Sequence, residues 1–143
     1  MLDLIICDTS VLILFEKINK LDVLKQLYSK IYITPEIALE FGNTLPGWIE
    51  VKEVKNKVLQ KTLSQALGIG ESSAIAMSLE LQNSLVAIDD LKARKIAISL
   101  EIKITGSLGI LIKAKEKGYI KQLKPILKKI EKTDFRISET LSN

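Results

Sequence analysis

The feature that most restricts the fold is a set of short apolar runs that carry no polar residue on either face. The clearest runs are Leu4 to Cys7, Ile31 to Ile33 and Leu85 to Ile88. Segments with apolar residues at helical spacing separate them. Because a strand without a polar face must be buried on both sides, this alternation predicts a short, mainly parallel sheet covered by helices on both faces. We therefore expect a three-layer α/β/α fold.

The remaining elements follow from periodicity and from glycine and proline positions. Pro35 is expected at the first position of a helix that Gly42 ends, and Gly68-Ile69-Gly70 is expected to separate two helices. The alternation from Ile49 to Val54 indicates an edge strand. In order, we expect strands at 4–7, 31–33, 49–54, 85–88 and 102–104, and helices near 11–18, 21–28, 35–41, 55–67, 71–81, 93–97, 111–118 and 120–130.

Length and composition indicate one folded domain. The chain has 143 residues, of which 47% are hydrophobic, and shows no internal repeat or linker, so we expect a single domain over residues 1–143. The longest apolar runs are far shorter than the roughly 20 residues of a membrane span. We expect no membrane partner and, with a lone Cys7, a cytoplasmic location.

The residue types that are missing restrict the chemistry more than the net charge of +4 does. With no histidine and one cysteine, the chain cannot build a Cys/His zinc site, a Ser-His or Cys-His couple, or an internal disulfide. A Walker A loop is absent, and Gly68-Ile69-Gly70 lacks the third glycine of a dinucleotide loop, so no nucleotide cofactor is expected. Any catalysis must use carboxylates, hydroxyls, Lys or Arg, or a metal held by oxygen atoms.

Carboxylates stand where a parallel sheet would gather them. Asp8 and Asp89 directly follow expected strands, Glu40 lies on the helix after the second strand, and Glu71 opens the helix after Gly70. Ligands bind outside the carboxyl ends of such strands. Because close like charges repel, a cluster of this kind requires a cation, and oxygen-only ligands select Mg²⁺ or Mn²⁺. Metal-assisted hydrolysis of a phosphodiester is the chemistry that this donor set favours.

Each acid also has a purely structural interpretation. Asp8 and the pair Asp89-Asp90 are good helix N-cap residues, and Glu71 in a first turn suits the helix dipole. Glu36 and Glu40 lie one turn apart and can form a solvated helix face. Taken singly, these interpretations are the more common ones, and only the joint placement after strands favours a site.

Several motifs together give the chain a family resemblance, and it covers nearly the whole length. It resembles a PIN-domain nuclease, of the prokaryotic subgroup related to VapC-type toxins. The segments that carry the resemblance are Asp8-Thr9-Ser10, Thr34-Pro35-Glu36 leading to Glu40, Gly68 to Ala76, Leu85 to Asp90 with Ala93-Arg94, Ile104 to Gly109, and Phe135 to Ser138.

The resemblance implies a Mg²⁺- or Mn²⁺-dependent ribonuclease on a PIN-like fold, with an acidic quartet as metal ligands and catalytic residues. The quartet falls on Asp8, Glu40, Glu71 and Asp89. It further implies supporting roles for the hydroxyls of Ser10 and Thr9 and, through water, for Asp90. Many relatives have Asp where this chain has Glu71, and Glu36 stands one helical turn from Glu40 as an alternative second acid.

The likeness also suggests an RNA substrate, a homodimer and a cognate antitoxin that covers the site. The RNA target, the number of metals and the presence of an antitoxin are left open by the sequence. Lys113 to Lys132 holds eight lysines and two glutamates, which suits RNA phosphates or a solvated amphipathic face. The main alternative is a PIN-like binding or assembly module with weak or no catalysis. An aspartyl-phosphate phosphatase or a receiver domain fits the acid positions less well.

Overall fold

The strands form one five-stranded sheet in which every pairing is parallel. The structure is a computed structural model that describes residues 3–133. The strand order is β3-β2-β1-β4-β5, so β1 lies at the centre. The sheet register sets Ile5 of β1 opposite Ile31 of β2 and Leu85 of β4. The expected α/β fold with a parallel sheet and helices around it is confirmed.

The described helices and strands alternate along the chain as the apolar pattern predicts. They are β1 (Leu4–Cys7), α1 (Thr9–Lys17), α2 (Asp22–Leu27), β2 (Lys30–Ile33), α3 (Pro35–Phe41), β3 (Ile49–Val51), α4 (Lys57–Leu63), α5 (Ile69–Glu80), β4 (Ser84–Ala87), α6 (Leu91–Ser99), β5 (Ile104–Thr105), α7 (Ser107–Glu116) and α8 (Lys124–Glu131).

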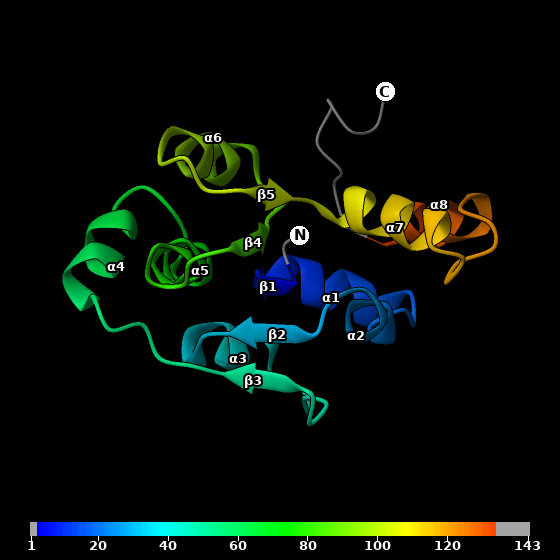
Figure 1. Cartoon of the computed structure of the whole chain (residues 1–143), viewed down its shortest axis with the longest axis horizontal. Coiled ribbons are helices and arrows are strands. Elements are labelled where there is room, and N and C mark those ends of the chain that lie inside the picture. The colour runs from blue at the N-terminus through cyan, green and yellow to red at the C-terminus, as the bar shows by residue number, and fades with distance from the viewer. Residues whose placement is uncertain (1–2, 134–143) are drawn as a thin grey trace.

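Helices lie on both sides of the sheet. In Figure 1, α4 and α5 lie to one side of the strands and α7 and α8 to the other. Helix α5 packs on β1 and β4, α2 packs on β2, and α6 packs on β5. The central residues Ile5 and Ile6 are fully buried, as is Val86 on the neighbouring strand. Burial on both faces explains why the central residues of these strands are apolar.

Two boundaries differ from the sequence-based expectation because of capping. Ile69 and Gly70 belong to the first turn of α5, so the expected spacer Gly68 to Gly70 is wrong and Gly68 is the N-cap residue. Helix α4 begins at Lys57 rather than near residue 55, because the Asn56 side chain accepts a hydrogen bond from the Leu59 N–H at 3.0 Å. A glycine or asparagine just before a helix favours a start at that point.

The other differences concern strand and helix length. Strand β3 ends at Val51 and lies at the sheet edge, as expected, whereas β5 covers Ile104–Thr105 instead of residues 102–104. Helix α8 is shorter than expected because Pro125 lies in its first turn, where the missing N–H has no cost. Within residues 3–133, no helix is long and apolar enough to cross a membrane.

Candidate functional site

Asp8 is the residue that links the central strand to the candidate site. It follows β1 directly, occupies the N-cap position of α1, and is only 3% exposed. Its side chain makes no capping hydrogen bond to the helix, and its Oδ2 accepts from the Ser10 hydroxyl at 3.3 Å. Helix capping therefore does not explain why an acid stands at this position.

A surface pocket brings three of the four expected acids together, and we call it the carboxylate pocket. Asp8 follows β1, Glu40 comes from the end of α3 and Glu71 from the first turn of α5. The residues that line the pocket are Asp8, Thr9, Ser10, Ile13, Glu40, Gly68, Gly70 and Glu71. The expected hydroxyls of Thr9 and Ser10 thus lie in the same pocket as the acids.

Glu40 is held against the start of α1. Its Oε1 accepts a hydrogen bond from the Thr9 hydroxyl at 2.6 Å. Gly70 lies directly beneath this carboxylate, because a Cβ built on Gly70 would stand 2.1 Å from Glu40 Oε1 and 2.9 Å from Thr9 Oγ1. The lack of a side chain at residue 70 is what allows α3 and α5 to bring their polar groups to α1 at this point.

Glu71 lies in the first turn of α5, where its Oε1 accepts from the Gly68 N–H at 3.2 Å. This contact is the half of a capping box that a glutamate supplies, and it agrees with the structural interpretation of this residue. The side chain is half-buried and faces the carboxylate pocket. Glu71 therefore has a structural partner and also a position beside Asp8.

Glu36 is directed away from the carboxylate pocket. Its Oε2 accepts a hydrogen bond from the Gln60 side-chain amide at 2.6 Å, which ties α3 to α4. Its Oε1 is buried with no hydrogen-bond partner within the described residues, as is the Oε1 of Gln60. Of the two acids that the sequence offers on α3, Glu40 is the one that lies in the pocket with Asp8.

Asp89 follows β4 and is held by the first residue of α7. Its Oδ1 accepts from the Ser107 N–H at 2.8 Å and its Oδ2 from the Ser107 hydroxyl at 2.5 Å. Both residues are buried. Asp89 is not among the residues that line the carboxylate pocket. Asp90 caps α6 by accepting from the Ala93 N–H at 2.9 Å, so the capping interpretation holds for this member of the pair.

The electrostatic field couples the acids of this region. Burial raises the pKa of Asp8 to about 7, and the charges of Glu71 and Glu40 add to the effect. Burial likewise raises the pKa of Glu71, helped by the charges of Asp90 and Glu40. The pKa of Asp89 is raised by burial, although the Ser107 hydrogen bonds and the Arg94 charge oppose the shift. Asp8 and Glu71 thus combine raised pKa values with a place in the same pocket, which is typical of functional sites.

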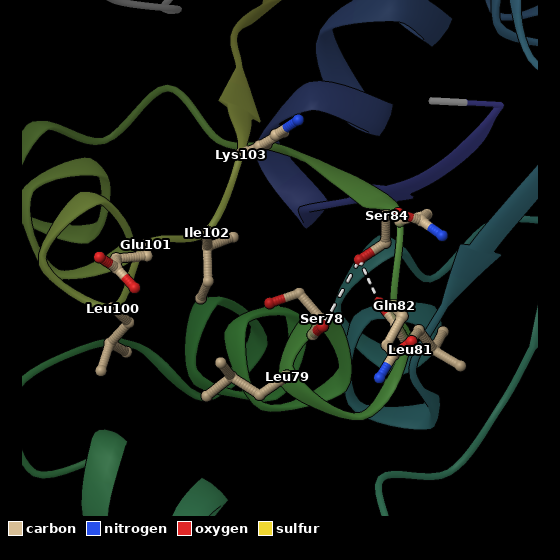
Figure 2. Close-up of a pocket in the computed structure, with 10 residues that line it drawn as sticks. Ser78, Leu79, Leu81, Gln82, Ser84, Leu100, Glu101, Ile102 and Lys103 are labelled. Carbon is tan, nitrogen blue, oxygen red and sulfur yellow. Dashed lines mark hydrogen bonds between the residues drawn. The ribbon is translucent and has the colours of Figure 1, made fainter. Parts of the chain in front are cut away.

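Another hollow lies at the opposite edge of the sheet, where β4 and β5 begin. Figure 2 shows it between α5, α6 and the start of these two strands, with Ser84 bonded to backbone oxygens. The Ser84 hydroxyl donates to Leu81 O at 2.8 Å. Asn83 and Glu101, which also line it, have positive φ angles of 59° and 60°. None of the expected site residues is part of this hollow.

A comparison with models of protein families identifies the family to which the chain is related. A family model described as a PIN domain matches residues 4–143. The chain belongs to the PIN-domain family. No curated protein and no solved structure matches it. PIN domains are generally nucleases and typically use divalent metal ions. The relation to VapC-type toxins stays a prediction, and the segment Phe135 to Ser138 that contributed to it lies outside the described residues.

The carboxylate pocket of this PIN domain has suitable donors for such an ion. Asp8, Glu40 and Glu71 supply carboxylate oxygens, and Ser10 and Thr9 supply hydroxyls, which is the hard ligand set of Mg²⁺ and Mn²⁺. Within residues 3–133, however, no group of three or more Asp, Glu or Cys side chains is arranged to hold a metal ion. Glu40 and Glu71 instead accept hydrogen bonds from Thr9 and Gly68. The donor chemistry fits, and closer ligation requires these side chains to turn.

Two residues of the PIN domain site were missed by sequence reasoning. Ser107 binds both oxygens of Asp89, and Gly70 makes room for Glu40. A signal for Ser107 was present, because it follows a strand in the same way as Asp8 and Asp89 follow theirs. Gly70 was interpreted as part of a spacer, and only the packing of α3 on α5 gives it this role.

Proposed function

We propose that this PIN domain is a Mg²⁺- or Mn²⁺-dependent endoribonuclease that hydrolyses RNA phosphodiester bonds at the carboxylate pocket. Asp8, Glu40, Glu71 and Asp89 are the proposed catalytic and metal-binding residues, with Thr9, Ser10 and Asp90 in support. The observation that carries the proposal is the convergence on one pocket, in a nuclease family, of three acids from the junction of β1 and α1, from α3 and from α5.

The burial of Asp8 is the strongest support for a cation at this pocket. Its carboxylate is 3% exposed and lies within the field of Glu40 and Glu71, and within the described residues it has no cationic partner. A buried acid among like charges is unfavourable unless it is protonated or neutralised. A divalent ion offsets these charges and, when bound, activates water and stabilises charge on the phosphate oxygens.

The side chains of the carboxylate pocket have different roles in the proposed site. Asp8 is fixed by the end of β1 and by the hydroxyl of Ser10, so it provides the rigid member of the ligand set. Glu40 is exposed and Glu71 half-buried, so their carboxylates have room to turn toward a ligand. Thr9 and Ser10 place hydroxyl donors beside the acids, where a phosphate oxygen would accept from them.

Asp89 has a different part in the proposal. Since Ser107 binds both of its oxygens, Asp89 is held in one orientation at the end of β4. It contributes negative potential at the carboxyl edge of β4, and each of its oxygens keeps a second lone pair that could ligate a cation while the Ser107 bonds persist. We keep it as the fourth acid on the resemblance to PIN-domain nucleases.

We extend the proposal to the biological setting that the resemblance implies. The protein is proposed to be the toxin of a toxin-antitoxin pair, to form a homodimer, to be covered by a cognate antitoxin and to act in the cytoplasm. A buried free thiol at Cys7 suits a reducing compartment. A sedimentation experiment that gives only a monomer at micromolar concentration would remove the dimer from this proposal.

The test of the nuclease is cleavage of a labelled RNA pool that contains single-stranded and structured molecules, with Mn²⁺, with Mg²⁺ and with EDTA. We expect cleavage with metal and none with EDTA, and loss of cleavage in Asp8→Asn and Glu71→Gln. Glu36→Gln is the matched control, because this acid contacts Gln60 outside the pocket, and it should retain activity if it folds. Equal cleavage by wild type and Asp8→Asn would refute the proposed site.

A second candidate function is a PIN-like binding or assembly module with weak or no catalysis. The observation that favours it is that, within residues 3–133, no cluster of three or more acidic side chains is arranged to hold a metal ion. Metal binding separates the two functions without an activity assay. A nuclease site predicts that millimolar Mn²⁺ raises the melting temperature of wild type and much less that of Asp8→Asn, because a ligand that binds only the native state stabilises it. Equal shifts in both proteins favour the module.

A further inference from the structure

A second pocket lies on the side of the sheet that carries α7 and α8, and its charge is opposite to that of the carboxylate pocket. Its lining comes from the turn after α1, the turn after α7 and helix α8. We call it the lysine pocket. It is lined by Lys20, Tyr119, Ile120, Lys121, Gln122, Pro125, Ile126 and Lys129.

Three lysines from three different segments border the lysine pocket, and no acid does. Lys20 comes from the turn after α1, Lys121 from the turn after α7, and Lys129 from α8. Within residues 3–133 none of the three forms an ion pair. Ammonium groups without a partner, held around one hollow, are neutralised best by an anionic ligand with several charges.

The floor and one wall of the lysine pocket are apolar. Ile120 and Ile126 are buried and Pro125 is the first-turn proline of α8. Tyr119 is 45% exposed, so part of its ring is open to solvent. A flat ring beside ammonium groups is the combination that accepts a nucleic-acid base next to its phosphates. A simple solvated lysine face does not require an exposed aromatic ring in a hollow.

The position of the lysine pocket relative to the carboxylate pocket is set by α1. Thr9, which lines the carboxylate pocket, is the first residue of this helix, and Lys20 of the lysine pocket follows shortly after its last residue, Lys17. The nine residues of α1 span about 14 Å. With a rise of about 3.4 Å per nucleotide along a stacked strand, that length corresponds to about four nucleotides.

We propose that the lysine pocket binds the phosphate backbone of single-stranded RNA about four nucleotides from the bond that is cut. The inference rests on the proposed nuclease function for the identity of the ligand. Lys20, Lys121 and Lys129 contact phosphates, and Tyr119 stacks on a base. The pocket thereby adds affinity for longer substrates without touching the scissile phosphate.

The test measures binding of a fluorescent single-stranded RNA of twelve nucleotides by anisotropy in EDTA, where cleavage does not interfere. The pocket variant is Lys121→Gln/Lys129→Gln. The matched control is Lys55→Gln/Lys103→Gln, which removes the same charge from exposed residues outside both the lysine and the carboxylate pockets. Circular dichroism verifies that each variant is folded.

We expect the pocket variant to bind the twelve-nucleotide RNA roughly 20-fold more weakly at 0.1 M salt, because each single-strand phosphate contact contributes a salt slope of about 0.7. The slope of log affinity against log salt should fall by about 1.4. The control variant should change both quantities much less. Tyr119→Ala should also weaken binding, whereas Tyr119→Phe retains it.

Equal losses of RNA affinity in the pocket and control variants would indicate general charge attraction and would overturn the inference. Unchanged RNA affinity in both variants would also overturn it. Binding of anionic lipid vesicles but not of RNA would overturn it as well. Cleavage of RNA by the wild-type protein tests the nuclease function independently of this binding assay. If wild type cuts RNA and the pocket variant binds normally, only the lysine pocket fails. If wild type does not cut but the pocket variant loses RNA affinity, the nuclease fails and the pocket stands.

Discussion

Replacing Gly70 by alanine tests the geometry of the carboxylate pocket directly. In an ordinary helix, alanine is favoured over glycine by about 1 kcal/mol. Here the new Cβ would stand 2.1 Å from Glu40 Oε1 and 2.9 Å from Thr9 Oγ1. The Glu40 carboxylate must therefore move, and its 2.6 Å hydrogen bond from Thr9 breaks.

The expected change in the free energy of unfolding on Gly70→Ala follows from these two opposing effects. A hydrogen bond to a charged group contributes about 1.5–3 kcal/mol, and the lower half of that range applies because Glu40 is exposed. Subtracting the helix gain of about 1 kcal/mol leaves Gly70→Ala destabilising by about 1 kcal/mol. In a Glu40→Ala background nothing needs to move except the Thr9 hydroxyl, so the same substitution should stabilise by about 1 kcal/mol.

The assay is a double-mutant cycle by urea unfolding of wild type, Gly70→Ala, Glu40→Ala and the double variant. The expected coupling is about 2 kcal/mol, with a change of sign between the two backgrounds. Gly47→Ala is the matched control, because a Cβ there has no neighbour within 4 Å and its effect should not depend on Glu40. If Gly70→Ala stabilises wild type as much as it stabilises Glu40→Ala, the close approach of Glu40 to α5 is refuted.

Three further predictions follow from individual side chains. Because burial raises the pKa of Asp8 to about 7, ionisation of this residue lowers native stability as pH rises from about 4 to about 7. In EDTA, Asp8→Asn should therefore raise the free energy of unfolding by up to about 4 kcal/mol at pH 8 and leave it unchanged at pH 4. An equal gain at both pH values would contradict this prediction. Ser107→Ala removes the 2.5 Å bond to Asp89 and should lower the free energy of unfolding by about 1.5–3 kcal/mol at pH 7, with Ser107→Thr as the conservative control. Glu101→Gly should stabilise by about 0.5 kcal/mol in thermal unfolding, because φ at residue 101 is 60°, and a loss of stability would show that the side chain has an unrecognised contact.

The sequence was sufficient to predict the order of elements and the sheet, because burial on both faces leaves a direct trace in the residues. The strand Leu4–Cys7 has no polar residue and lies at the sheet centre, and Ile49–Val51 alternates in polarity and lies at the edge. Element ends were less predictable, since they depend on single hydrogen bonds such as the Asn56 cap of α4. Such caps are decided by one side chain and leave no periodic signal.

The site was predictable to the extent that topology brings strand ends together. The expected convergence at the carboxyl ends of the strands agrees with the pocket that Asp8, Glu40 and Glu71 line, whereas Asp89, which also follows a strand, is not part of its lining. The choice between Glu36 and Glu40 was not predictable, because both are on α3 and only the packing of α4 gives Glu36 a partner in Gln60. The same limit applies to Asp89, whose orientation depends on a serine 18 residues away.

The free-energy cost of burying a charged carboxylate at residue 8 indicates a functional role for this residue. An N-cap asparagine or serine would begin α1 without placing a charge at a site that is 3% exposed and close to two glutamates. The Asp8 side chain makes no capping bond, so the helix gains little from it in return. A buried acid whose charged form is disfavoured by burial, and whose side chain, within the described residues, hydrogen-bonds only to its neighbours Thr9 and Ser10, is best explained by a chemical role. For Asp8 the chemistry that we propose is the binding of a cation, which would remove the charge repulsion that otherwise makes the residue unfavourable.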